Sequence, residues 1–282
     1  MKLFRYLLIL YFICFNSHAD VLMLIRDDVF KNYQQFLNGR DVMKVNDFSG
    51  PYVRRDVVDM IIVQQALRLG GFQHRFKYGQ GKVNYRNKQM LIKGKLLLSF
   101  DSYWLLDAND ISEYVYISEP VINNGEYFAG IFANPNHPTI FTLASKEQLK
   151  NYTAVSTDKW KTDWKTLSEL PLKKLVKEDG WVSQARMVEK MWVDFFLMPF
   201  QKNENSIYQL QDIKLKPVNN VAILLKDSRH FVVSKNHPLG NLAINAINKG
   251  MSKLRVEHKI YKAYKQAGFF IDEKQYNVIN RN

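Results

Sequence analysis

The chain has 282 residues, with 40 Lys and Arg against 27 Asp and Glu, so its formal net charge is +13. The one cysteine, Cys14, lies within the first nineteen residues, and removal of that segment would exclude disulfides, thiolate nucleophiles and Cys-ligated metals. A chain of this length exceeds one typical hydrophobic core and predicts two domains or lobes.

The first nineteen residues, 1–19, predict a signal peptide. Lys2 and Arg5 precede an apolar run over 6–15, and the small residue Ala19 stands at the expected cleavage point. The run is shorter than the roughly twenty residues that a membrane-spanning helix needs. We therefore expect a periplasmic protein, cleaved after Ala19, with a net charge of +11. Export argues against a nucleic-acid partner, so the positive charge either attracts anionic ligands or a membrane surface, or is an ordinary solvated face.

Alternating strands and helices are predicted from residue 20 onward. Pro51 suits the first position of a helix, and Gly70-Gly71 suit its end. The long polar stretch 27–49 is expected to be irregular. The expected elements of this half are strands at 20–25, 72–79 and 95–104 and helices at 52–69 and 84–94.

The stretch 115–133, VYISEPVINNGEYFAGIFA, interrupts this alternation and predicts a joint. After it the same order returns, which predicts a second sheet covered by helices. The expected elements are strands at 152–157, 172–179 and 193–200, helices at 162–170 and 183–192, then a strand at 230–235 and one long amphipathic helix at 239–267. The basic side of that last helix is most simply a solvated face.

Three segments carry a resemblance to a known family: LLLSFDSYW, YISEPVINNGEYFAGIF and HFVVSKNHPLGNLAINAINKGMSKL. They resemble the strand, the Ser-Asp-Pro-Tyr-like step, the crossing strands and the closing helix of periplasmic solute-binding proteins of the extracellular family 3 type. The resemblance implies an α/β, type II two-lobe fold, in which each lobe is a β-α-β-α-β sheet unit. Two hinge strands, 128–133 and 230–234, would join lobe 1 (20–127 with 234–282) to lobe 2 (128–233).

Ligands in such folds bind where the carboxyl ends of strands and the amino ends of helices meet. Arg54 and Arg55 lie in the first turn of a predicted helix, where a cation opposes the helix dipole, and this favours an anionic ligand. The alternative is a surface pair with Asp56 or Asp59. The expected ligand-binding residues are Arg54, Arg55, Asp101, Ser102, Trp104, Ser156, Thr157, Asp158, Met198 and Phe200.

The other expected site residues follow predicted strands. Residues 101–104 come after the last strand of the first unit, where Asp101 can accept hydrogen bonds and Trp104 can stack on a ligand or a cation. The alternative is a turn Asp and a core Trp. Residues 156–158 end the first strand of the second unit and either hold an anion or cap a helix. Met198 and Phe200 would form an apolar wall.

The sequence departs from the family pattern at two charged positions. The Arg that forks onto an amino-acid carboxylate falls near Ile111, and the Asp that takes the ammonium falls near Pro199. The loss of a charge-assisted pair argues against a standard amino-acid ligand.

The resemblance therefore implies a monomeric, non-enzymatic binding protein that captures a small polar or anionic solute by hinge closure. Its partner would be a membrane transporter permease or a membrane sensor. No cofactor or metal is expected, since the six histidines lack metal-ligand spacing. One alternative is a dehydratase-like enzyme that uses Asp101 or Glu119 as general acid or base beside Arg54. Another is an interaction protein whose cleft no longer binds any solute.

Overall fold

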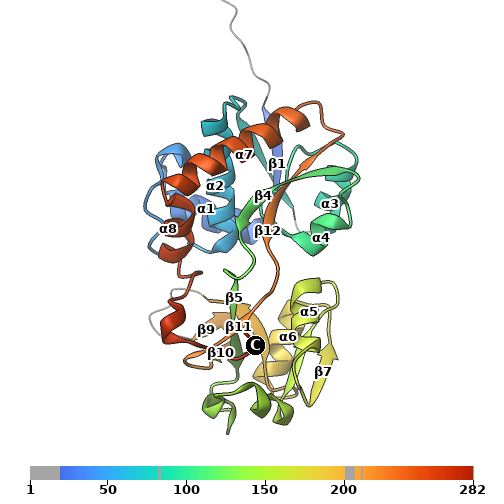
Figure 1. Ribbon diagram of the computed structural model, residues 1–282, viewed down its shortest axis with the longest axis vertical. Helices are drawn as coiled ribbons and strands as arrows, with labels where there is room; N and C mark the ends of the chain where they lie inside the picture. Colours follow the sequence, from blue (N-terminus) through green and yellow to red (C-terminus); the bar gives the residue numbers. More distant parts are fainter. Residues whose placement is uncertain (1–19, 82–83, 201–206, 211, 282) are drawn as a thin grey trace, which may run out of the picture.

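The computed structural model describes residues 20–281 apart from 82–83, 201–206 and 211, and its elements gather into two lobes along the long axis (Figure 1). The predicted signal peptide lies outside the described residues. Within the described part of the chain, every helix is too short or too polar to cross a bilayer.

Lobe 1 contains two small sheets with helices packed around them. One sheet has the order β3-β12-β4, and the other is a parallel pair of β1 and β2. The strands are β1 (Val21–Arg26), β2 (Phe76–Gly81), β3 (Tyr103–Trp104), β4 (Val115–Ile122) and β12 (Arg229–Ser234). The helices are α1 (Asp27–Leu37), η1 (Val42–Lys44), α2 (Arg55–Gly70), α3 (Asn84–Ile92), α4 (Leu105–Asn109), α7 (Gly240–Val256) and α8 (Lys259–Gln266).

Helix α2 is the central element of the lobe 1 core. Its residues from Asp56 to Leu67 are all buried, as expected for a helix that is covered on every side. Helix α7 packs directly on it, because Gly70 meets the backbone of Ala246 and Gly250 meets the backbone of Ala66. This close approach joins the C-terminal end of α2 tightly to α7.

Lobe 2 is built on a sheet around β5, all of whose residues are buried. The sheet has the order β13-β11-β5-β10-β9, with β8 also paired to β5, and β6 and β7 form a separate parallel pair. The strands are β5 (Phe128–Ala133), β6 (Thr153–Ser156), β7 (Lys174–Lys177), β8 (Phe196–Pro199), β9 (Tyr208–Leu210), β10 (Ile213–Pro217), β11 (Val221–Leu224) and β13 (Asn277–Val278). The helices are η2 (Ile140–Thr142), η3 (Lys146–Asn151), α5 (Lys161–Ser168), α6 (Trp181–Glu189) and η4 (Glu273–Gln275).

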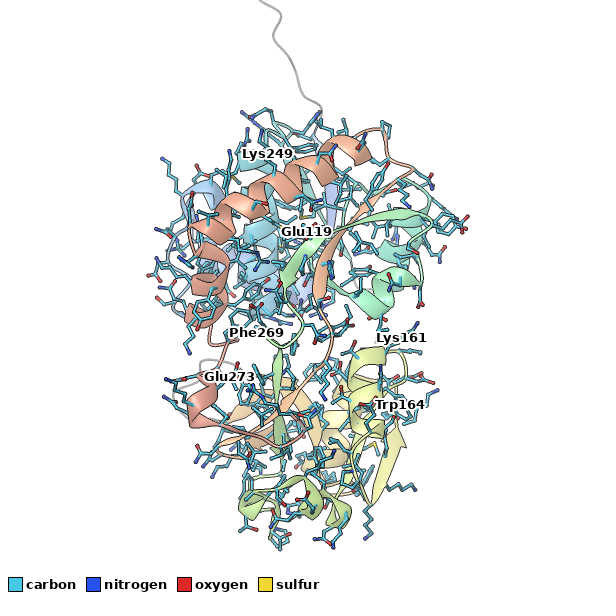
Figure 2. All side chains as sticks on the ribbon, viewed as in Figure 1. Glu119, Lys161, Trp164, Lys249, Phe269 and Glu273 are labelled. Carbon is cyan, nitrogen blue, oxygen red and sulfur yellow. The ribbon has the colours of Figure 1, made fainter. Side chains whose placement is uncertain are left out.

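The described part of the chain crosses between the lobes three times. The segments 123–127 and 225–228 join β4 to β5 and β11 to β12, directly beside the expected hinge strands. The third crossing follows α8 and runs from Phe269, at the edge of lobe 1, to η4 at Glu273 in the other lobe (Figure 2). Strand β13 then pairs with β11, and the Asn280 side chain bonds the backbone N–H and C=O of Leu224.

These pairings correct the expected lobe boundaries. Residues 229–233 were expected in lobe 2, but β12 pairs with β3 and β4 in lobe 1. The end of the range 234–282 was expected in lobe 1, but β13 belongs to the lobe 2 sheet. This crossing could not be predicted from the sequence. The segment after α8 is largely polar, and its strand β13 has only two residues, which is too short to show a periodicity.

Two expected elements are also corrected. The stretch 27–49 is not irregular, because α1 and η1 lie within it; α1 buries only Val29, Tyr33 and Phe36, so its pattern was sparse. The single helix expected at 239–267 is two helices, since His258 adopts a left-handed conformation with φ of 54°. A left-handed residue cannot continue an α-helix, so α8 turns away from α7.

Candidate functional site

Charged and aromatic side chains of lobe 1 meet where the two lobes face each other. They come from the start of α2, from the loop before β3, from the first crossing and from the start of β12. We call this set the interlobe cluster; it consists of Arg55, Asp59, Asp101, Ser102, Trp104, Tyr127 and Arg229.

Asp59 organises the cluster from beneath. Its side chain is fully buried, and Arg55 donates to it at 2.6 Å. Ser102 donates both its backbone N–H (2.9 Å) and its hydroxyl (2.7 Å), and the Tyr264 hydroxyl is a further donor. The Asp59 carboxylate is therefore satisfied inside the protein, and it holds Arg55 and Ser102 in place.

Arg229 is the cation of the cluster without an ionic partner. Its Nε donates to the Ser102 hydroxyl at 2.9 Å, and its Nη2 donates to the Ser102 carbonyl. The guanidinium lies 4.6 Å from the centre of the Trp104 ring and 6.0 Å from that of Tyr127. Among the described residues, no carboxylate lies within 4 Å of Arg229. Burial, and then the charge of Arg55, lowers the Arg229 pKa, although the more distant charges of Asp59 and Asp101 act against this.

Arg55 and Asp101 form the more accessible part of the cluster. Their side chains are 18% and 21% exposed, and Arg55 Nη2 lies 3.8 Å from Asp101 Oδ2. Burial raises the pKa of Asp101, although the charges of Arg55 and Arg229 act against this. The Ser99 hydroxyl donates to the other carboxylate oxygen at 2.9 Å.

Helix α5 of lobe 2 faces this cluster. Burial raises the pKa of Asp163 to about 6, and the Arg229 charge is the main effect that lowers it, which places the two groups within electrostatic reach. The Thr162 hydroxyl donates to Asp227 at 2.9 Å, and Lys161 pairs with Asp110 of lobe 1. Figure 2 shows Lys161 at the end of α5 that points toward lobe 1.

The structure brings together four of the expected site residues: Arg55, Asp101, Ser102 and Trp104. Arg54 lies apart from them. It bonds Asp56 at 2.8 Å, which is the pairing named as its alternative, and it also bonds Asp28 at 3.2 Å. Arg55 likewise bonds Asp59 at 2.6 Å, which is the alternative named for it.

The expected lobe 2 residues do not converge with these four in the structure. Asp158 pairs with Lys177 on the surface, and the Thr157 hydroxyl donates to Asp179 at 2.6 Å. Ser156 is buried at the end of β6. Met198 and Phe200 are each packed in a core cluster of buried apolar residues.

Four important residues were missed: Asp59, Tyr127, Asp163 and Arg229. Two carried a readable signal. Asp59 is a carboxylate within the apolar run VVDMIIV, and Arg229 directly precedes the apolar strand HFVVS. A charge flanked by buried apolar residues needs a partner, and that requirement could have singled out both.

No group of three or more His, Cys, Asp and Glu side chains in the described ranges is arranged to hold a metal ion. A surface hollow of about 200 Å³ lies elsewhere in lobe 1, between η1, α2 and β2, and it includes no residue of the interlobe cluster. The candidate site is therefore identified by the charged and aromatic side chains of the interlobe cluster.

No protein-family model matches the sequence, and no curated protein matches it. Among solved structures, the chain is similar to the periplasmic VFT2 domain of Bordetella pertussis BvgS, with 14% identity, a TM-score of 0.56, and coverage of 74% of this chain and 83% of that one. It is also similar to the probable amino-acid ABC transporter extracellular-binding protein ytmK of Bacillus subtilis, with 13% identity, a TM-score of 0.53, and coverage of 89% and 100%. The arginine-, lysine-, histidine-binding protein ArtJ of Geobacillus stearothermophilus matches with 12% identity, a TM-score of 0.52, and coverage of 88% and 95%.

This chain has the type II periplasmic-binding fold. The expected fold is thereby confirmed, and identities this low support the fold alone. Within it, Ile111 is buried and Pro199 lies in β8, so neither supplies a charge. Two sets of opposite charges lie on the two lobes of this type II periplasmic-binding fold: Lys161 pairs directly with Asp110, and Asp163 lies within electrostatic reach of Arg229.

Proposed function

We propose that this protein is an exported solute-binding protein. It captures a small solute that carries an anionic group between its lobes, and it presents that solute to a membrane transporter or a membrane sensor. The observation that carries the proposal is Arg229, a buried cation at a lobe crossing with no carboxylate within 4 Å among the described residues. A buried unpaired charge is costly, and an anionic group of the solute would remove that cost.

The groups around Arg229 indicate which other chemical groups the solute should carry. Trp104 and Tyr127 offer ring faces beside it, and their centroids are 4.5 Å apart. Asp163 contributes a carboxyl group from lobe 2, so a solute with both an anionic group and a hydrogen-bonding or cationic group would touch both lobes. Only a ligand that binds the closed arrangement better can shift the lobes toward closure. The arginine-, lysine-, histidine-binding protein ArtJ and the probable amino-acid ABC transporter extracellular-binding protein ytmK, which share the fold, support a solute of this size and a transporter as the partner.

An enzyme on the same fold is less well supported. That alternative needed Asp101 or Glu119 beside Arg54. Glu119 is exposed on β4, where its backbone N–H bonds Asn248 of α7, and Arg54 is paired with Asp56 and Asp28. Glu119 and Arg54 thus have different partners and do not contact each other.

The test is thermal unfolding of the chain from Asp20, refolded after denaturation to release bound solute, with amino acids, dicarboxylates, aromatic acids, sugars and polyamines. A solute at 100 times its dissociation constant adds about 2.7 kcal/mol, or a shift of roughly 5–10 °C. We expect stabilisation by an anionic solute, which stays chemically unchanged. Arg229→Lys should reduce that shift, whereas Lys150→Gln, on the surface of lobe 2, should not.

Because Arg229 is buried, Asp163→Asn serves as a second, partly exposed variant, and circular dichroism checks that each variant is folded. An uncharged or cationic solute that stabilises all of these proteins equally would contradict the anion anchor. Conversion of the solute would show an enzyme, and no stabilisation by any compound would favour a protein partner.

A further inference from the structure

The exposed side of helices α7 and α8 carries a concentrated positive charge. Residues 240–267 contain one acidic residue, Glu257, and six basic ones. We call these six the basic face: Lys249, Lys253, Arg255, Lys259, Lys262 and Lys265. Figure 2 shows Lys249 on α7, and none of the six belongs to the interlobe cluster.

Large apolar side chains stand among these cations. Leu242 and Val256 lie seven residues on either side of Lys249, so all three share one side of α7. Leu242 is 51% exposed, Val256 is 81% exposed, and Tyr261 on α8 is 54% exposed. The opposite side of each helix is buried against the lobe, so this exposed pattern is not part of the core.

In the part of the chain that the structure describes, the cations of the basic face form no ion pair. Among the described residues, no carboxylate lies within 4 Å of any of the six. Lys253 and Arg255 donate to the backbone carbonyls of Leu69 and Pro120 instead. Burial and the charge of Lys262 both lower the pKa of Lys259, although Glu257 acts against them. Lys259 and Lys262 also lie in the first turn of α8, where cations oppose the helix dipole.

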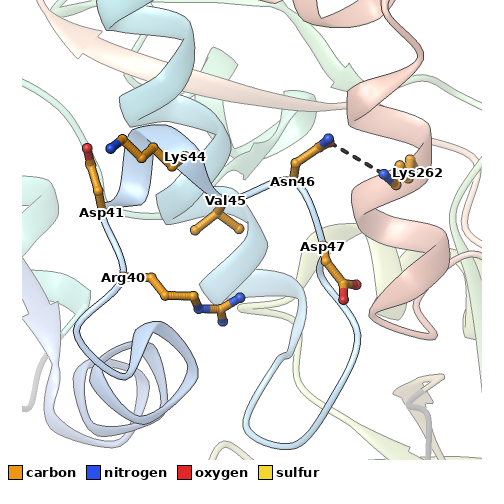
Figure 3. Close-up of a pocket in the computed structure, with 7 residues that line it drawn as sticks. All are labelled: Arg40, Asp41, Lys44, Val45, Asn46, Asp47 and Lys262. Atoms are coloured by element: carbon orange, nitrogen blue, oxygen red, sulfur yellow. Dashed lines mark hydrogen bonds between the residues drawn. The ribbon is translucent and has the colours of Figure 1, made fainter.

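A hollow of about 560 Å³ extends the basic face toward η1 (Figure 3). Arg40, Lys44 and Lys262 line it together with Asp41 and Asp47. Lys262 reaches the Asn46 side chain across it at 3.4 Å. The hollow is large enough to admit a phosphate headgroup beside Lys262.

An anionic partner of the basic face would be either an acidic protein or an anionic membrane surface, and the residue types of the basic face distinguish between these two. Five of its six cations are lysines. Arginine is enriched and lysine depleted in protein–protein interfaces, because the planar guanidinium pairs with carboxylates in a fixed geometry. Lysine is a point charge that responds to the potential of a charged surface. Lysines interspersed with exposed Leu, Val and Tyr are the pattern of a helix that lies at a membrane interface.

We propose that the basic face docks this protein onto a bilayer surface that contains anionic phospholipids. The lysines pair with the headgroup phosphates, and Leu242, Val256 and Tyr261 enter the interface region. The inference does not depend on which solute is bound, since the interlobe cluster contributes nothing to it.

The test is sedimentation of the chain from Asp20 with vesicles, which excludes any contribution of the apolar segment 6–15. Vesicles of pure phosphatidylcholine are compared with vesicles that also contain phosphatidylglycerol, at low and high salt. We expect binding to the anionic vesicles alone, and loss of binding as salt screens the charges.

A charge-matched pair of variants then locates the surface. The quadruple change of Lys249, Lys259, Lys262 and Lys265 to Gln should lower the partition coefficient about 100-fold or more, since each basic residue near an anionic surface adds about 1 kcal/mol. The control changes Lys150, Lys165, Lys173 and Lys174, all exposed in lobe 2, to Gln and has the same net charge. It should bind within about three-fold of the unmodified chain.

Equal losses in the two quadruple variants would overturn the proposal, because the net charge rather than the basic face would then govern binding. Equal binding to neutral vesicles, or no binding at low salt, would also overturn it. The double variant Leu242→Ser with Val256→Ser tests the apolar contribution. It should bind the anionic vesicles more weakly although its charge is unchanged. An unchanged partition coefficient would show that Leu242 and Val256 do not enter the membrane interface.

Discussion

At the scale of single residues, Asp59 has the largest predicted effect on stability. Its carboxylate accepts from Arg55, from the Ser102 N–H and hydroxyl, and from Tyr264. Asp59→Asn removes the charge and leaves Arg55 without its closest counterion, so we expect the free energy of unfolding to fall by about 3–5 kcal/mol. Urea unfolding followed by circular dichroism measures this. Asp212→Asn, which breaks the exposed pair with Arg186, should cost about 1 kcal/mol or less, and a similar loss in both variants would contradict the role of Asp59.

Asp163 predicts a pH dependence of stability. Burial raises its pKa from 3.8 to about 6 in the folded protein. Between these values the folded state binds more protons than the unfolded state, so this contribution to stability is present at low pH and is lost as pH rises through about 6. Asp163→Asn removes the penalty of the buried charge.

We therefore expect Asp163→Asn to unfold at higher urea concentration than the unmodified chain at pH 7.5, with a gain of about 1–2 kcal/mol, and we expect that gain to fall by about half at pH 5, because the unfolded pKa of 3.8 lies below that pH. The matched variant Asp158→Asn changes an exposed carboxylate three residues before α5, and it should have little effect at either pH. A gain that is the same at both pH values would show that Asp163 does not titrate in this range.

At the scale of helices and strands, the crossing of α2 and α7 depends on two glycines. A Cβ at Gly250 would lie 1.8 Å from the carbonyl oxygen of Ala66, a backbone atom that cannot move aside without shifting α2. Helix propensity alone would favour Gly250→Ala by about 1 kcal/mol, but the clash should reverse the sign and cost about 2 kcal/mol or more. Asn245→Ala, on the exposed side of α7, is the control and should be neutral or slightly stabilising. Thermal unfolding compares the two, and a Gly250→Ala protein as stable as the control would refute the close crossing.

The same helices show how far the sequence determines the structure. The C-terminal end of α2 was predictable because the Gly70-Gly71 pair acts locally, and Gly71 is left-handed as expected. The start was expected at 52, directly after Pro51, but the helix begins at Arg55. The break between α7 and α8 was not predictable, since His258 is left-handed without being glycine. Arg55 could be placed near a site because it lies in the first turn of α2, as expected. Arg229 and Asp163 come near Arg55 only through tertiary packing. A local sequence pattern cannot predict which distant residues such packing brings together.

At the scale of the whole molecule, the third crossing constrains the relation between the lobes. Two crossings beside the expected hinge strands would allow rotation about a short axis, and closure would be absorbed by a few backbone angles. The third segment anchors lobe 1 helix α8 to the lobe 2 sheet through β13, with Asn277 N–H bonded to the Asn220 carbonyl at 2.7 Å. The crossings at 123–127 and 225–228 are bonded to each other by the Leu225 N–H and the Tyr127 carbonyl at 3.0 Å. Lobe motion is therefore limited to directions that all three segments permit.

Contacts between the lobes in this structure predict an equilibrium between closed and open forms. Lys161 pairs with Asp110, and Asp227 accepts from the Thr162 hydroxyl and the Leu106 N–H. An exposed ion pair is worth about 1 kcal/mol or less, whereas a hydrogen bond to a buried carboxylate contributes about 1.5–3 kcal/mol. Asp110→Asn combined with Thr162→Val should therefore shift the population toward the open form by about ten-fold or more. The affinity for solute should fall in proportion to the closed fraction that is lost.

Small-angle X-ray scattering measures this shift as a larger radius of gyration for the solute-free double variant, which saturating solute should reverse. The control breaks the Lys177–Asp158 pair, which has a similar exposure but lies entirely within lobe 2, and it should leave the radius unchanged. If the double variant keeps the radius of the unmodified chain and binds solute equally well, the three crossings alone set the lobe angle. If its radius increases and solute does not reduce it, the interlobe cluster does not couple binding to closure. The double variant thus separates the rigidity of the crossings from the contribution of the contacts that the solute would reinforce.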